Sequence, residues 1–152
     1  MLNLAVQIVN YKTKRYLIDC LDSALGDLEN SKISYKILIL DNNSGDDLKD
    51  LEEQYKSKKV KFYFSDKNLG FGGGHNFLAK QGKSEFILVL NPDINFIEAK
   101  TVERLLNFLK EKISKRVVVV GPKLINEEGP QQWDHGRLHG FWAWLAELTG
   151  NT

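Results

Sequence analysis

Near the middle of the chain the sequence reads Glu85-Phe86-Ile87-Leu88-Val89-Leu90-Asn91-Pro92-Asp93. Its first six residues form the most apolar strand-like run in the protein, which predicts a central strand buried on both faces of a sheet. Pro92 has no backbone N–H to donate, so the strand must end before it. Asp93 is therefore expected to stand at a fixed place just beyond the carboxyl end of this strand.

Strand-like and helix-like patterns alternate on both sides of this run. Short runs rich in β-branched residues predict further strands, whereas apolar residues spaced three and four apart predict amphipathic helices. The expected strands are 2–9, 35–40, 60–64, 85–90 and 116–120, and the expected helices are about 14–25, 47–56, 70–81 and 102–113. This alternation predicts an α/β fold in which the strands are mainly parallel.

Composition and charge limit the partners. The 152 residues carry a formal net charge of +1, so no global field attracts nucleic acid or an anionic membrane. The single cysteine, Cys20, falls in the apolar stripe of the first helix and is expected to be a core residue rather than a nucleophile. The apolar runs are too short to cross a bilayer, and the opening strand lacks a basic leader and a cleavage site. We therefore expect a cytoplasmic protein.

Polar residues follow three of the expected strands. They are Asn10-Tyr11, Asp41 and Asn91-Pro92-Asp93. In open α/β sheets, ligands bind in the crevice beyond the carboxyl ends of the strands. The need to form a turn explains the neighbouring residues Asn42, Asn43 and Gly45. It explains only in part why polar residues follow three different strands. These ends therefore indicate a ligand site.

A glycine-rich segment reads Asn68-Leu69-Gly70-Phe71-Gly72-Gly73-Gly74-His75-Asn76. Glycines let the backbone approach a ligand, and the start of a helix suits a phosphate. The spacing is neither that of a dinucleotide fingerprint nor that of a P-loop. A tightly packed turn explains the segment about as well as a phosphate site does.

Asp93 has two interpretations of its own. One carboxylate together with substrate phosphates is a usual way to hold Mg²⁺, so Asp93 is a candidate metal ligand. It could equally cap the helix that follows.

The polar and glycine-rich segments, in this order, resemble the family 2 glycosyltransferases of the GT-A fold, and in particular the branch of rhamnosyltransferase-like enzymes. The resemblance spans about residues 2–129. The matching motifs are Val9-Asn10-Tyr11, Ile39-Leu40-Asp41-Asn42-Asn43-Ser44, the glycine-rich segment Asn68–Asn76, Leu90-Asn91-Pro92-Asp93 and Gly121-Pro122-Lys123-Leu124.

The resemblance implies a GT-A type α/β/α sandwich with a mixed, mainly parallel sheet that binds a nucleoside-diphosphate sugar, linked to UDP or dTDP, with Mg²⁺ or Mn²⁺. By the same likeness Tyr11 lies against the base, Asp41 bonds the base or ribose, and Asp93 binds the metal. The residues implied to line the donor site are Asn10, Tyr11, Asp41, Asn43, Asn68, Gly70, Gly74, His75, Asn76 and Asn91.

Two positions depart from the family pattern. Asn91 stands where the metal motif has its first acid, which leaves Asp93 as the only carboxylate there. His75 stands where many relatives have arginine, so a permanent cation is replaced by a side chain that is mostly neutral at pH 7.

Residues 1–125 are expected to form the nucleotide-sugar-binding domain, and residues 126–152 an irregular segment rich in tryptophan. The acid that would act as catalytic base has no convincing match after Gly121, although Asp134 and Glu147 are candidates. We therefore expect the chain to stop before the acceptor half. Trp142 and Trp144 are expected to pack within the protein or in a homo-oligomer rather than at a membrane surface.

The activity implied is inverting transfer of the sugar to a hydroxyl of a saccharide or lipid-linked acceptor, in the synthesis of cell-surface polysaccharide, with the enzyme in the cytoplasm or at the inner face of the membrane. The alternative is a non-catalytic module that binds nucleotide sugars or forms oligomers. A nucleotidyltransferase is disfavoured, because Asn10-Tyr11-Lys12-Thr13 is not the glycine-rich basic loop that such enzymes carry after their first strand.

Overall fold

The computed structural model describes residues 2–56, 59–112 and 119–125. The chain divides into two compact units, residues 1–108 and 109–152. The first unit contains all the strands that the structure describes. The described residues of the second unit are the last turn of one helix and residues 119–125. The expected strand 116–120 therefore lies mostly outside the described residues.

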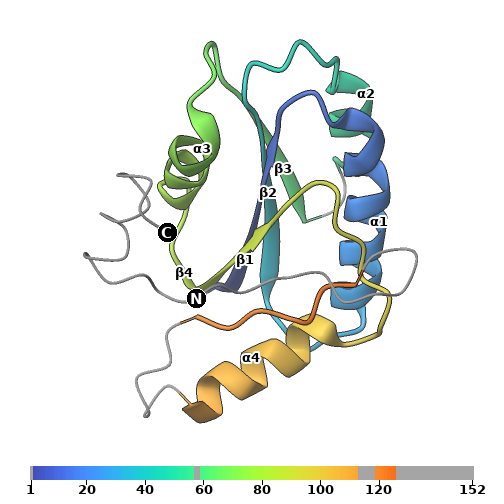
Figure 1. Cartoon of the computed structure of the whole chain (residues 1–152), viewed down its shortest axis with the longest axis vertical. Coiled ribbons are helices and arrows are strands. Elements are labelled where there is room, and N and C mark those ends of the chain that lie inside the picture. The colour runs from blue at the N-terminus through green and yellow to red at the C-terminus, as the bar shows by residue number, and fades with distance from the viewer. Residues whose placement is uncertain (1, 57–58, 113–118, 126–152) are drawn as a thin grey trace, which may run out of the picture. The chain divides into compact units, whose positions relative to one another are not determined.

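The elements alternate as the sequence predicts (Figure 1). Four strands form the described part of the sheet: β1 (Leu2–Asn10), β2 (Tyr35–Asp41), β3 (Val60–Phe64) and β4 (Ser84–Leu90). The helices are α1 (Lys14–Glu29), α2 (Lys49–Tyr55), α3 (Gly70–Ala79) and α4 (Thr101–Lys112). The described strands run in the order β3-β2-β1-β4, and all their pairings are parallel.

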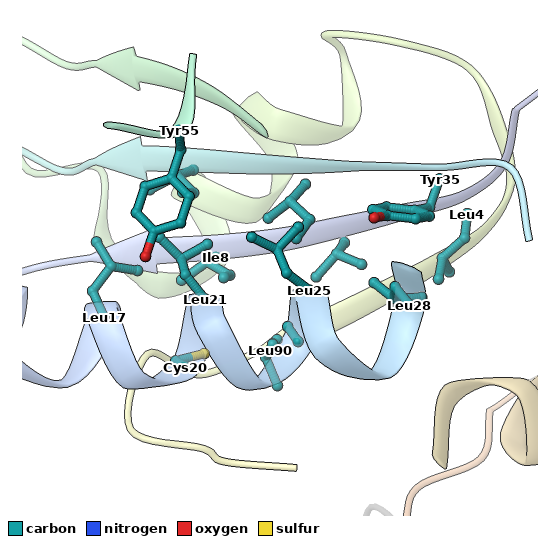
Figure 2. Packing of buried hydrophobic residues seen from close by; sticks show 14 of the residues in the cluster. Leu4, Ile8, Leu17, Cys20, Leu21, Leu25, Leu28, Tyr35, Tyr55 and Leu90 are labelled. Carbon is teal, nitrogen blue, oxygen red and sulfur yellow. The ribbon is translucent and has the colours of Figure 1, made fainter. Parts of the chain in front are cut away.

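The main core lies on one face of this sheet. The apolar stripe of α1 packs on side chains of β1 and β2 that point to the same face, as Figure 2 shows for Leu21, Leu25 and Ile8. Leu51 and Tyr55 of α2 and Val102 and Leu106 of α4 complete this cluster. Helix α3 covers the opposite face with a smaller core, so the sheet lies between two helical layers. The predicted α/β sandwich is therefore confirmed.

The expectation that residues 85–90 form a central strand buried on both faces is wrong for the described sheet. β4 lies at its edge, and Ile87 and Val89 are 52% and 50% exposed. Phe86 and Leu88 face the main core, but α3 packs over β1 and β2 and leaves the other side of β4 uncovered by described residues. A continuous apolar run is compatible with a strand at the centre or at the edge of a sheet. Only the order in which the strands pair distinguishes these two positions.

Candidate functional site

The polar strand ends meet at one edge of the sheet. Asn10 at the end of β1 is in register with Asp41 at the end of β2, and Ile8 of β1 is in register with Leu90 at the end of β4. Asn91 and Asp93 therefore continue from the same edge at which Asn10 and Asp41 lie. This is the carboxyl edge, where open parallel sheets bind their ligands.

A buried polar network joins the ends of β1 and β2. Asn10 is fully buried, and its Nδ2 lies 3.1 Å from Oδ1 of Asp41, 3.3 Å from Oγ of Ser44 and 3.0 Å from Oδ2 of Asp46. The hydroxyl of Ser44 also donates to Oδ1 of Asp41. Both side-chain contacts to Asp41 fall on Oδ1, and this carboxylate is only 7% exposed. These contacts fix the orientation of the carboxylate.

Some members of this network were not expected from the sequence. Thr13 donates to Oδ1 of Asn10 at 2.8 Å, and Asp46 accepts the backbone N–H of Lys14 at 3.2 Å. Asp46 follows Asp41 by five residues in the same loop, which is the only signal in the sequence that could have pointed to it. Thr13 and Asp46 do not act as isolated turn residues, because they hold the Asn10 side chain from two sides.

The backbone after β1 is unusual. Lys12 has φ 60, a left-handed conformation that a residue with a long side chain rarely adopts. Such strain concentrates at functional sites. The preceding residue, Tyr11, is 44% exposed, with the Lys12 ammonium 5.4 Å from the centre of its ring. A partly exposed aromatic ring thus follows β1 at the carboxyl edge.

A second polar connection links the loop after β2 to the glycine-rich segment. Asn42, which turn formation alone would explain, is 2% exposed. Its Oδ1 accepts the backbone N–H of Leu69 at 2.8 Å, and its Nδ2 donates to Oδ1 of Asn68 at 2.9 Å. The structure therefore brings Asn68 beside the loop that carries Asp41, whereas Asn43 is exposed with φ 58.

The glycines of the segment have different roles. Gly70 has φ 71 at the first residue of α3, a conformation suited to glycine. Gly74 is buried against the sheet, where an added Cβ would lie 2.9 Å from one methyl of Val9 and 3.0 Å from the other. Close packing thus explains Gly74 without a ligand. Asn76 is exposed, and Gly72 has open space around it.

His75 also faces the sheet. Its Nδ1 lies 3.3 Å from the side-chain amide of Gln7, and its buried Nε2 has no hydrogen-bond partner among the described residues. The pKa of His75 is lowered because burial disfavours the charged ring. Gln7 precedes Asn10 by three residues, roughly 10 Å along a strand. The contact of His75 with Gln7 thus lies away from the Asn10 network, and its ring also packs against that of Phe71, with ring centroids 4.5 Å apart.

Asn91 and Asp93 are both exposed beyond β4. The interpretation of Asp93 as a cap of the next helix is wrong, because α4 begins only at Thr101 and its first N–H groups bond Asp27 of α1. The described residues contain no group of three or more His, Cys, Asp or Glu that could hold a metal. A metal at Asp93 would therefore need further oxygen ligands, and the phosphates of a bound substrate are of the right kind.

Cys20 is a core residue, as the sequence predicts. It is fully buried, and its Sγ lies 3.5 Å from the carbonyl oxygen of Asn91. Burial raises the pKa of the thiol to about 12, and the negative charge of Asp93 adds to this effect. The thiol is therefore protonated and unreactive at neutral pH.

The predictions on residues 126–152 lie outside the described residues, including the tryptophan-rich segment and the candidate bases Asp134 and Glu147. Within the part of the chain that is described, no helix is both long and apolar enough to span a membrane.

Comparison with known proteins identifies relatives in sequence and in fold. A family model described as glycosyl transferase family 2 matches residues 5–151. The chain is 29% identical to the chondroitin synthase of Escherichia coli over 127 residues, which are 82% of this chain and 18% of that protein. It is 28% identical over 116 residues to the poly(ribitol-phosphate) beta-glucosyltransferase of Bacillus spizizenii, with 74% of this chain and 18% of that protein covered. The chain therefore spans less than a fifth of the length of either relative.

Solved structures show the same fold. S. aureus TarS (1–349) in complex with UDP-GlcNAc matches with a TM-score of 0.63 and 24% identity, over 74% of this chain and 32% of that one. The mannosyltransferase PcManGT of Pyrobaculum calidifontis, in complex with GDP-Man and Mn²⁺, matches with a TM-score of 0.64 and 13% identity, over 70% of this chain and 32% of that one. The predicted GT-A type fold is thus confirmed, and the match of the family model over almost the whole sequence shows that the chain belongs to glycosyl transferase family 2.

Proposed function

We propose that this chain holds a nucleoside-diphosphate sugar at the carboxyl edge of β1, β2 and β4, as the donor part of an inverting glycosyltransferase. The observation that carries the proposal is the buried network in which Asn10 and Ser44 orient the carboxylate of Asp41. A carboxylate held in this way accepts hydrogen bonds from the base or ribose of a nucleotide, and the Tyr11 ring at the rim offers a face for the base. UDP-GlcNAc and UDP are the ligands in TarS structures that share the fold, which supports a donor of this class.

The donor is proposed to carry UDP or dTDP, as the resemblance to the rhamnosyltransferase-like branch implies. The acceptor is proposed to be a hydroxyl of a saccharide or of a lipid-linked saccharide. Relatives named for chondroitin and poly(ribitol-phosphate) are consistent with polysaccharide synthesis at the cell surface. We also propose that the enzyme acts at the cytoplasmic side of the membrane, where nucleotide sugars are made.

In the proposed reaction the acceptor oxygen attacks the anomeric carbon from the side opposite the diphosphate. The new glycosidic bond forms as the bond to the diphosphate oxygen breaks, and a carboxylate takes the proton of the acceptor hydroxyl. We place that carboxylate after residue 125, outside the described residues. The described part of the chain orients the donor and holds its diphosphate.

Asp93 and Asn91 are proposed to hold Mg²⁺ or Mn²⁺ together with the diphosphate. The exposed carboxylate of Asp93 and the amide oxygen of Asn91 are hard donors that suit such an ion. Two ligands are too few to bind it alone, so the diphosphate would have to supply the others. When bound, the ion would neutralise charge on the departing diphosphate. PcManGT, which has the same fold, was solved with Mn²⁺.

The first test is a thermal-shift titration of the chain with UDP, dTDP and their sugars. A ligand that binds only the folded state stabilises it by about 2.7 kcal/mol at a hundredfold excess over its Kd. For a chain of this size that corresponds to a rise in Tm of roughly 5–10 °C. Asp41→Asn, which keeps the shape but removes the charge, should reduce the shift, whereas Glu52→Ala on the exposed face of α2 should leave it unchanged. No shift at millimolar UDP and dTDP in a folded sample would refute the donor site.

The second test concerns the metal. Asp93→Ala should remove the increase in diphosphate affinity that Mn²⁺ gives and leave the affinity measured in EDTA unchanged, because Asp93 is the only carboxylate of the motif. Isothermal titration with UDP in Mn²⁺ and in EDTA measures both affinities. Glu98→Ala, at another exposed acid of the same loop region, is the matched control. An unchanged dependence on Mn²⁺ in Asp93→Ala would show that Asp93 is not a ligand.

A further inference from the structure

The turn that carries Asp93 lies against helix α1. The thiol of Cys20 donates to the carbonyl oxygen of Asn91 at 3.5 Å, and the backbone N–H of Ile94 donates to the same oxygen at 3.3 Å. Burial raises the pKa of the thiol to about 12, the charge of Asp93 also raises it, and a hydrogen bond from the N–H of Ile94 lowers it. The buried thiol therefore lies beside both ends of the turn.

A second contact holds the chain beyond the turn. Ser23 follows Cys20 by three residues, so the two side chains are neighbours on one face of α1. The hydroxyl of Ser23 donates to the carbonyl oxygen of Cys20 at 3.0 Å and accepts the backbone N–H of Phe96 at 3.3 Å. Ile94 and Phe96 are partly buried against the main core. Helix α1 therefore holds the backbone on both sides of Asp93.

The position of Asp93 depends on this backbone. Its side chain is exposed, and no hydrogen bond or ion pair joins its carboxylate to any of the described residues. β4 ends at the buried Leu90, and the chain forms no further helix or strand until Thr101. No regular element thus holds Asp93 in place, and the contacts with α1 take over that role.

The place of this carboxylate matters because metal coordination is strict. Mg²⁺ requires near-ideal octahedral geometry, with ligands at about 2.0–2.1 Å. The motif Asn91-Pro92-Asp93 contains one carboxylate, so a shift of the turn would move the only charged ligand that it offers. Groups that orient a metal ligand without touching the metal are a common part of such sites. The thiol of Cys20 and the hydroxyl of Ser23 are placed to act in this way.

We propose that Cys20 and Ser23 are positioning residues that hold Asp93 where it can share Mg²⁺ or Mn²⁺ with the diphosphate of the donor. They act through the backbone of residues 91–96 and touch neither the metal nor the donor. This inference rests on the proposed metal site at Asp93. It adds that the buried face of α1 controls the part of the donor affinity that depends on the metal.

The test measures the Kd of UDP in Mn²⁺ and in EDTA by isothermal titration, with dTDP used if it binds better. The ratio of the two values is the gain in affinity from the metal. Cys20→Ala combined with Ser23→Ala removes both groups and should reduce this gain about tenfold, or abolish it where the wild-type gain is smaller. The Kd in EDTA should stay within about twofold, because neither residue belongs to the Asn10–Asp41 network. Electron paramagnetic resonance of Mn²⁺ in the presence of UDP reads the metal affinity directly.

Two further variants separate positioning from general stability. Cys20→Ser combined with Ser23→Thr keeps a hydroxyl at each position and should retain most of the gain from the metal. Leu28→Val changes a fully buried side chain of the same helix, about two turns beyond Cys20. It should lower stability and leave the gain unchanged.

Each result bears on the inference. An unchanged gain in the double alanine variant would overturn it, and so would an equal loss of affinity in Mn²⁺ and in EDTA or the same loss of gain in Leu28→Val. If the double variant does not fold, the gain is read from Ser23→Ala alone, and a value equal to that of the wild type would overturn the inference. A wild-type chain that binds UDP equally well in Mn²⁺ and in EDTA would instead refute the metal site, and one that does not bind UDP or dTDP would refute the donor site.

Discussion

Replacing Asp27 by Ala is expected to lower the free energy of unfolding by about 2–4 kcal/mol. Asp27 belongs to α1, but its carboxylate accepts the backbone N–H groups of Thr101 at 2.8 Å and Val102 at 3.0 Å, at the start of α4. Val102 is buried in the main core, so the alanine variant leaves N–H groups in a place where water does not readily replace the lost acceptor. The negative charge also interacts favourably with the positive end of the α4 dipole.

Urea denaturation and thermal melting measure this effect. The melting temperature should fall by roughly 5–15 °C for a chain of this size. Asp19→Ala makes the same change at an exposed position of the same helix and should stay within about 0.5 kcal/mol of the wild type. Asp27→Asn, which keeps one acceptor oxygen, should fall between the two. Equal stabilities for Asp27→Ala and Asp19→Ala would show that the cap contributes nothing.

Replacing Gly74 by Val is expected to destabilise the chain by about 2–4 kcal/mol through overpacking. The Cβ alone would lie 2.9 and 3.0 Å from the two methyls of Val9 and 3.3 Å from Leu40, and the branched methyls would add to the conflict. Val9 cannot move aside easily, because a β-branched side chain is stiff at χ1 and β1 lies between two paired strands. Helix α3 would have to move away from the sheet.

Gly72→Val is the matched control for this prediction. It makes the same change two residues earlier in α3, where an added Cβ meets nothing within 4 Å, and should alter stability by less than about 0.5 kcal/mol. Combining Gly74→Val with Val9→Ala should restore part of the loss, because neighbouring packing changes are not additive. If the double variant is no more stable than the sum of the two single changes predicts, the destabilisation does not come from the contact between residue 74 and Val9.

Several parts of the proposed donor site follow from the sequence, and for a physical reason. Asn10 and Asp41 end strands whose apolar pattern is local, and parallel strands place such ends at one edge. Asp93 follows a proline that must end its strand. The roles that involve packing could not be predicted in the same way. Gly74 and His75 lie in the same segment as Gly70, yet they face the sheet, and this depends on how α3 is rotated against β1 and β2.

The sequence by itself determined the alternation of strands and helices, the α1 stripe that contains Cys20, and the polar residues that end β1 and β2. Each of these follows from periodicity or from the chemistry of a few adjacent residues. Only the tertiary structure decided that β4 lies at the edge of the described sheet, that Asp27 caps α4, and that Asn42 holds the start of α3. Those contacts join residues 27 to 75 positions apart. They depend on strand order and on the rotation of each helix against the sheet, and the core as a whole sets both.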